Sequence, residues 1–162
     1  MGKFTKKIIR FDIETLINEL NKALADEYLA AYQYWVGAKV IEGPFSDLVK
    51  KELEEHSKDE YNHAEMIANR IIQLDGVPIL NPHDWFRLTK CGFLEPKNFK
   101  SIPILKQNIQ GERCAIGVYD TLLKEIHGKD NITYHLIGKI LEDEVEHECD
   151  LEQILKNISM KK

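Results

Sequence analysis

The sequence predicts an all-α protein built as a four-helix bundle, and two observations carry this prediction. Apolar residues recur at helical spacing along four long stretches of a chain of 162 residues. Helix-ending glycine and proline residues separate the stretches, at Gly43-Pro44, at Gly76-Val-Pro78 and at Gly128. The four helices are expected at residues 12–42, 46–75, 102–127 and 131–158, with a crossover at 76–101.

Each expected helix has an apolar stripe that would face the core. In chain order, the stripes include Leu20, Leu24 and Tyr34; Leu53, Ile67 and Leu74; Leu105, Ile109 and Ile116; and Ile137, Ile140 and Leu151. Asp130 or Asn131 can cap the fourth helix. The first and second helices are joined by a short link, as are the third and fourth, so each pair should be an antiparallel hairpin. The long crossover must then run from one end of the bundle to the other, with a short extra helix near residues 82–90.

Composition limits the class of protein. With 43% hydrophobic residues, residues 1–162 can bury the core of a single domain. No stretch is apolar and long enough to span a membrane, and the N-terminus has no apolar signal core. Three widely spaced cysteines do not form the framework of a secreted domain. We therefore expect a cytoplasmic protein.

The charge pattern gives a secondary prediction about nucleic acid. The formal net charge of −5 argues against a surface that is mainly a DNA footprint. Residues 1–10 form a basic tail, with Lys3, Lys6, Lys7 and Arg10, which could contact phosphate. A solvated tail is the simpler interpretation.

The most informative feature is a repeated Glu-x-x-His motif. It occurs as Glu60-Tyr-Asn-His63 and as Glu144-Val-Glu-His147, and each copy follows a lone glutamate, Glu27 or Glu112, by nearly the same length of chain. Residues three apart lie on one face of a helix, so each motif directs a carboxylate and an imidazole to one point. Four helices would therefore bring four carboxylates and two imidazoles to one level of the bundle.

These six residues fill gaps in the apolar stripes, which places polar groups at core positions. Burying an unpaired carboxylate costs roughly several kcal/mol unless a cation neutralises its charge. Two divalent ions would balance four carboxylates, with neutral histidines. A single motif of this kind would more often be a surface feature, but two copies in register predict a two-metal site. The predicted ligands are Glu27, Glu60, His63, Glu112, Glu144 and His147.

The neighbours of these ligands remain open to two interpretations. His56 lies one turn before Glu60 and could orient a ligand or hold an ion in transit, or it could be an ordinary core histidine. Tyr34 and Tyr119 each follow a ligand glutamate by two turns. They could bond to the ligands or quench radicals, or they could simply pack in the core.

At this point the chain resembles the ferritin-like superfamily over essentially its full length. The six residues match the ligands of a bacterioferritin-type ferroxidase centre, and the segments ending at Trp35 and His147 are also similar to family segments. Together with Cys91 and Cys114 and the short chain, this pattern most resembles the Dps-like subgroup called thioferritins. The resemblance implies a closed shell of twelve subunits, and two iron ions at the centre.

The resemblance also implies a function. It predicts a ferroxidase that oxidises Fe(II) with hydrogen peroxide or oxygen, and that stores iron and protects against oxidative stress. Carboxylate and imidazole ligands would also accept manganese, zinc or copper, so iron rests on the resemblance. The alternatives are a rubrerythrin-like or manganese-catalase-like enzyme that removes peroxide, a substrate oxygenase, or a cage protein that coats DNA.

The cysteines allow a more specific expectation. Cys91 lies in the crossover, and Cys114 lies two residues beyond Glu112, on a side of its helix that the crossover must pass. A loop cysteine can approach a helix cysteine to disulfide distance, and the resemblance implies that Cys91 and Cys114 form a redox-active pair near the metal centre. Cys149 would then be free. The alternative is three free, buried cysteines.

Overall fold

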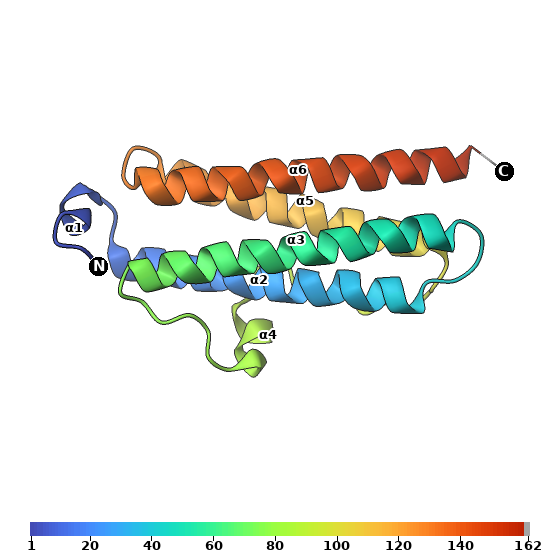
Figure 1. Ribbon diagram of the computed structural model, residues 1–162, viewed down its shortest axis with the longest axis horizontal. Coiled ribbons are helices and arrows are strands. Elements are labelled where there is room, and N and C mark those ends of the chain that lie inside the picture. The colour runs from blue at the N-terminus through green and yellow to red at the C-terminus, as the bar shows by residue number, and fades with distance from the viewer. Residues whose placement is uncertain (161–162) are drawn as a thin grey trace.

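Four long helices form the body of the protein, which is described here from a computed structural model covering residues 1–160. The helices run parallel to the long axis of the molecule (Figure 1) and no strand occurs among the described residues, so the all-α prediction is confirmed. The elements are α1 (Thr5–Ile8), α2 (Ile13–Val40), α3 (Ser46–Gln73), η1 (Pro82–Asp84), α4 (Trp85–Leu88), α5 (Ser101–Ile126) and α6 (Asn131–Ser159).

The order of the helices follows from the links between them. α2 and α3 form one antiparallel hairpin, and α5 and α6 form the other (Figure 1). Residues 74–100 run from the end of α3 to the opposite end of the bundle, where α5 begins. As a result, α3 and α5 point in the same direction, and the two hairpins pack together into a bundle. None of the helices in residues 1–160 has both the length and the apolar character needed to cross a membrane.

Local chemistry sets the ends of the helices. Asp12 caps α2 by accepting a hydrogen bond from the backbone N–H of Thr15, over 2.8 Å. Asp130 caps α6 in the same way, accepting from the N–H groups of Ile132 and Thr133. The tight link between α5 and α6 needs a left-handed residue, and Gly128 supplies it with φ of 69°.

The core consists of two apolar clusters, one toward each end of the bundle. The first contains buried residues such as Leu20 of α2 and Ile140 of α6, and the second contains residues such as Leu53 of α3 and Leu105 of α5. On all four helices, the predicted ligands fall between the residues of the two clusters. The candidate site is therefore a polar layer across the middle of the core, with a dry cluster on either side.

The basic side chains of the N-terminal residues are exposed, while the backbone of this segment is held against the bundle. Thr5–Ile8 form the short helix α1, and the backbone N–H of Arg10 donates to the carbonyl of Lys129 over 2.7 Å. Ile9 and Phe11 pack against the first core cluster. The apolar side chains on either side of Arg10 thus hold this segment against the bundle.

The crossover lies along the outside of α2 (Figure 1). The short helix expected near residues 82–90 is present as η1 followed directly by α4. Trp85 of α4 stacks on Tyr28 of α2, with ring centroids 4.7 Å apart. Further along, the backbone N–H of Leu94 donates to the side chain of the buried Gln33 over 2.8 Å. These contacts place the middle of the crossover next to the polar layer.

Candidate metal centre

The structure brings all six predicted ligands together in the polar layer. Glu27 comes from α2, the motif at residues 60–63 from α3, Glu112 from α5 and the motif at residues 144–147 from α6. Each of the six has at most 5% of its surface exposed. Helical spacing explains the convergence, because residues three apart on α3 and on α6 project to the same side.

Ligand atoms of these residues form two overlapping groups, within each of which all of the atoms lie within 4.8 Å of one another. Glu60 and Glu144 belong to both groups. The first group is completed by Glu27 and His63, and the second by Glu112 and His147. Two carboxylates shared by two groups are the arrangement expected for a pair of ions bridged by Glu60 and Glu144.

The polar atoms of this layer fit metal ions better than they fit one another. His63 Nδ1 lies 3.0 Å from an oxygen of Glu144, and His147 Nδ1 lies 3.2 Å from an oxygen of Glu60. Even so, both of these nitrogens, and one oxygen each of Glu27, Glu60 and Glu144, have no hydrogen-bond partner with acceptable geometry. Buried polar atoms are rarely left without partners. Unpaired carboxylate oxygens and imidazole nitrogens that lie this close together therefore indicate a cation site.

The electrostatics of the metal-free layer lead to the same conclusion. Burial, together with the charge of Glu60, raises the pKa of both Glu27 and Glu112. Burial alone would lower the pKa of His147, but its contacts with Glu144 and Glu60 outweigh that effect and raise the pKa to about 10. Without a metal, protons must neutralise this layer. Cations bound there would replace them.

A second set of residues holds the ligands in place. Tyr34 donates a hydrogen bond from its hydroxyl to Glu112, and Tyr119 does the same to Glu27. Of the two interpretations that the sequence left open, the structure therefore favours bonding to the ligands. Burial raises the pKa of both tyrosines, with the carboxylate partner adding to the effect, so both stay protonated as donors.

The outer nitrogens of the two histidines also face carboxylates. His63 Nε2 lies 3.2 Å from Asp143, and His147 Nε2 lies 3.7 Å from Asp59. The 3.2 Å contact of His63 is a hydrogen bond, and such an acceptor on the outer nitrogen directs the inner Nδ1 toward a metal, as is usual for histidine ligands; the contact of His147 is an ion pair too long for a hydrogen bond. Neither aspartate is part of the Glu-x-x-His motifs. One signal could have revealed them, because each directly precedes a ligand glutamate, Glu144 or Glu60.

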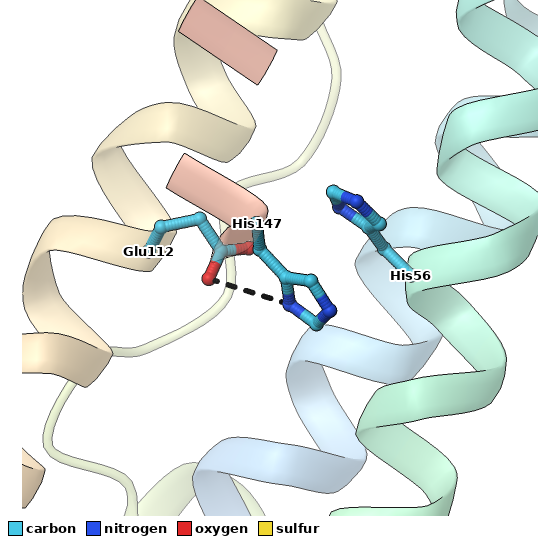
Figure 2. Close-up of side chains that lie close together, drawn as sticks. All are labelled: His56, Glu112 and His147. Atoms are coloured by element: carbon cyan, nitrogen blue, oxygen red, sulfur yellow. Dashed lines mark ion pairs between the residues drawn. The ribbon is translucent and has the colours of Figure 1, made fainter. Parts of the chain in front are cut away.

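His56 lies beside the layer and has 3% of its surface exposed. Figure 2 shows His56 from α3, Glu112 from α5 and His147 from α6, whose ligand atoms also lie within 4.8 Å of one another. The dashed line marks the 4.0 Å ion pair between Glu112 and His147. The rings of His56 and His147 are stacked, with centroids 4.0 Å apart. Burial, followed by the nearby His147, lowers the pKa of His56 to about 3, so this ring is neutral.

Cys91 and Cys114 form a disulfide, and Cys149 is free and exposed. A cavity of about 190 Å³ is lined by both cysteines and by four carboxylates of the polar layer, Glu27, Glu60, Glu112 and Glu144. The disulfide therefore lies on the wall of the same cavity as the candidate centre. A small oxidant in this cavity would be in reach of both groups.

Asp26, which was not among the residues predicted from the sequence, fixes this part of the crossover. One of its oxygens accepts hydrogen bonds from the backbone N–H groups of Lys90 and Cys91, both over 2.9 Å, and from the hydroxyl of Thr89. Burial raises its pKa, against the effect of these hydrogen bonds. Its position just before Glu27 repeats the Asp-Glu pattern of the other two aspartates.

A bundle of four long helices around buried carboxylates and histidines is the arrangement of helix-bundle proteins that can hold metal ions in their core. The chain belongs to the ferritin-like family, since the family model described as Ferritin-like domain matches residues 17–161.

Two individual relatives are consistent with membership of this family. The DNA protection during starvation protein of Pyrococcus furiosus is 33% identical over 146 residues, which are 89% of this chain and 78% of that protein. Bacterioferritin of Brucella melitensis biotype 1 is 33% identical over 135 residues, which are 82% of this chain and 77% of that protein.

Solved structures of ferritin-like proteins are also similar to this chain. A dodecameric thioferritin from Bacteroides fragilis, a bacterioferritin-related protein, is 44% identical with a TM-score of 0.95, over 99% of this chain and 96% of that one. Dps from Thermosynechococcus elongatus, at 16% identity and a TM-score of 0.83 over 94% of this chain and 95% of that one, shares the fold. The expected resemblance to ferritin-like proteins and thioferritins is thus confirmed.

Proposed function

We propose that this protein is a ferroxidase that oxidises Fe(II) to Fe(III) at the polar layer. One observation carries the proposal: potential ligand atoms without hydrogen-bond partners lie close together in the polar layer. They belong to Glu27, Glu60, His63, Glu144 and His147. The ferritin-like family implies iron as the metal. Carboxylates and imidazoles are suitable ligands for iron in both oxidation states.

The oxidant that suits this site is hydrogen peroxide or oxygen. Two Fe(II) ions give one electron each to a peroxide molecule, which takes up two protons and leaves as two water molecules. Paired one-electron donors thereby avoid release of a hydroxyl radical. The chain's own part would be to hold both ions with the two groups of ligands that share Glu60 and Glu144, and to orient Glu112 and Glu27 through Tyr34 and Tyr119.

The cysteine pair fits the same chemistry. In the dithiol form, Cys91 and Cys114 would supply two electrons and two protons to peroxide in the shared cavity and would become the disulfide. We infer that the pair is redox-active and that it protects the centre from excess peroxide.

We also propose that the protein assembles into a closed homo-oligomer that stores the ferric product. The dodecameric thioferritin supports a shell of twelve subunits, because that structure covers nearly all of this chain. The side chain of Phe86, 65% exposed on α4, is a candidate for a contact between subunits. Size-exclusion chromatography with light scattering measures the subunit count directly, and a monomer would remove the storage proposal while leaving the centre intact.

Rapid mixing of Fe(II) with the wild-type protein and with Glu60→Ala tests the ferroxidase proposal. Loss of even a supporting residue at a metal site typically costs about 10- to 100-fold, so loss of a shared ligand should slow oxidation by at least about 100-fold. Glu65→Ala is the matched control, because Glu65 is an exposed glutamate on the same helix. Equal rates in all three proteins would reject the site.

Two alternative functions can be tested with the same purified protein. A rubrerythrin-like or manganese-catalase-like enzyme would consume peroxide without accumulating Fe(III), and metal analysis would report manganese or zinc in place of iron. A DNA-coating function, suggested by the name of the Pyrococcus furiosus relative, would give a gel shift. Removal of residues 1–10 would abolish that shift.

A further inference from the structure

A second group of possible ligands lies outside the candidate centre, in a cleft between α3 and α6. The cleft has a volume of about 410 Å³. His56 and His147 line it together with Glu52 of α3 and Asp150 of α6. One ligand atom each of Glu52, His56 and Asp150 lies within 4.8 Å of the other two.

The geometry of this triad suits a shared ion better than direct pairing. His56 Nε2 lies 3.4 Å from a carboxylate oxygen of Glu52, one helical turn before it on α3. That distance is long for a strong hydrogen bond but ordinary for two ligands of one ion. Asp150 reaches the same point from the facing helix, so the triad is not a local feature of one helix.

Two further observations point to a ligand. His56 is almost completely buried, and its Nδ1 has no hydrogen-bond partner. In addition, Glu52 carries a charge that its surroundings oppose: partial burial raises its pKa, and the negative charges of Asp150 and Glu55 add to the effect. A buried imidazole with one unpaired nitrogen, beside two carboxylates that repel each other, is an arrangement that a bound cation would stabilise.

We propose that Glu52, His56 and Asp150 form a second metal site, which binds one divalent transition-metal ion. Two carboxylates balance the charge of such an ion, and one neutral imidazole selects transition metals over calcium or magnesium. The cleft leaves room for water in the remaining coordination positions. The site is distinct from the candidate centre, because Glu52 and Asp150 belong to neither of the two groups in the polar layer.

His56 connects the two places. Its ring is also grouped with Glu112 and His147 and is stacked on His147 (Figure 2). An ion in the cleft would therefore lie one imidazole away from the centre. On the proposed ferroxidase function, this position would serve iron moving between the cleft and the centre, but the binding of an ion there does not depend on that function.

Zinc is a suitable probe, because it takes the same ligands and does not change its oxidation state. Crystals of the full-length wild-type protein soaked in Zn(II) should show an anomalous peak at about 2.0–2.2 Å from Glu52, His56 and Asp150. Calorimetric titration with Zn(II) should find one more ion per subunit in the wild type than in the double variant Glu52→Gln/Asp150→Asn. A wild-type crystal without a peak at the triad overturns the proposal.

A matched double variant separates binding from general attraction of cations. Glu55→Gln/Glu146→Gln removes the same charge from the same cleft without touching the triad, and it should bind as many ions as the wild type. Equal stoichiometry in both double variants would also overturn the proposal. Glu60→Ala distinguishes the two sites: it should lose zinc from the polar layer and keep the peak at Glu52, His56 and Asp150. Zinc at the triad with none in the wild-type polar layer would count against the ferroxidase centre alone.

Discussion

The carboxylate of Asp26 accepts a hydrogen bond from the backbone N–H of Cys91 over 2.9 Å, and so links the disulfide to the helix that carries Glu27. Asp26 and Glu27 are neighbours on α2, but they serve different partners. Asp26 faces the crossover, and Glu27 faces the polar layer. A change in the cysteine pair would therefore reach Glu27 through a single hydrogen bond and the next residue of α2.

Asp26→Ala should loosen the crossover around Cys91. The substitution leaves the N–H groups of Lys90 and Cys91 without an acceptor, which should lower the free energy of unfolding by about 1–3 kcal/mol. The disulfide should also be reduced faster by dithiothreitol, as followed by thiol alkylation. Asp84→Ala is the control, since Asp84 is in the same crossover but bonds only to Arg87 among side chains of the described residues. Unchanged reduction kinetics in Asp26→Ala would contradict the assigned role.

Peptide mapping under non-reducing conditions should find Cys91 joined to Cys114 after treatment with peroxide, with Cys149 free. Cys114→Ser should lower the free energy of unfolding by about 3 kcal/mol, because the bond closes a loop with a sequence separation of 23. Cys149→Ser, at an exposed position, should have little effect. Three alkylatable thiols in the oxidised protein, or a link to Cys149, would show the pairing to be wrong.

Tyr34→Phe tests the hydrogen bond to Glu112. The side chain keeps its packing but no longer orients the carboxylate, and we expect Fe(II) oxidation to slow by about tenfold. Tyr119→Phe should have a similar effect through Glu27. Tyr134→Phe, at an exposed position on α6, is the control and should oxidise Fe(II) at the wild-type rate. If Tyr34→Phe does so as well, Tyr34 is only a packing residue.

Metal binding at the polar layer should release protons. The pKa of His147 is raised to about 10, so this group holds a proton near neutral pH when no metal is bound, and burial raises the pKa of Glu27 and Glu112 in the direction that favours their protonated forms. Ligands must lose those protons, so affinity for Zn(II) should rise with pH. Calorimetry in two buffers of different ionisation enthalpy counts the released protons, and a heat independent of the buffer would contradict this prediction.

The same shift has the opposite effect on the stability of the metal-free protein. The folded-state pKa of His147 lies above its ordinary value of 6.5, so protonation of His147 favours folding. That contribution is fully present below pH 6.5 and is lost as the pH rises through about 10. Denaturation of the chelator-treated protein between pH 6 and pH 10 measures it, with His147→Gln as the variant that should show a flatter profile.

Asp130→Asn should destabilise the end of the bundle where α6 begins. Asp130 is buried, pairs with Arg70 over 2.7 Å and caps α6, so we expect a loss of about 3 kcal/mol at neutral pH. Its hydrogen bonds with Thr133 and Arg70 outweigh burial and lower its pKa below 3.8. Its stabilising effect is therefore present above pH 3.8 and is lost as the pH falls through the lowered pKa, so the difference in stability between the two proteins should shrink below pH 3.8.

Much of the fold could be predicted from the sequence, because helix periodicity and helix-ending residues are local signals. The bounds of α3 and α6 differ from the expected ones by one or two residues, as is usual for helix ends. The segment before α2 could not be predicted in the same way. Its position depends on Ile9 and Phe11 meeting the first core cluster, which is a contact between distant parts of the chain.

The residues of the candidate site likewise differ in whether local sequence signals could identify them. Glu60 and His63 could be identified because their spacing places both on one helical face. Asp26 and Asp143 share one sequence signal, since each directly precedes a ligand glutamate, but their contacts are with other elements and could not be read from the sequence. His56 could be noted but not assigned, since its environment depends on how α6 packs against α3.

Each of the two tyrosines beside the polar layer bonds to a glutamate of the other hairpin, and this arrangement suggests how the protein originated. Tyr34 of the first hairpin bonds to Glu112 of the second, and Tyr119 of the second bonds to Glu27 of the first. Neither hairpin alone can complete its own half of the site, whereas two copies of one hairpin would complete each other. The arrangement is what duplication and fusion of a gene for a self-pairing hairpin would leave behind, with the crossover as the segment added to join the copies.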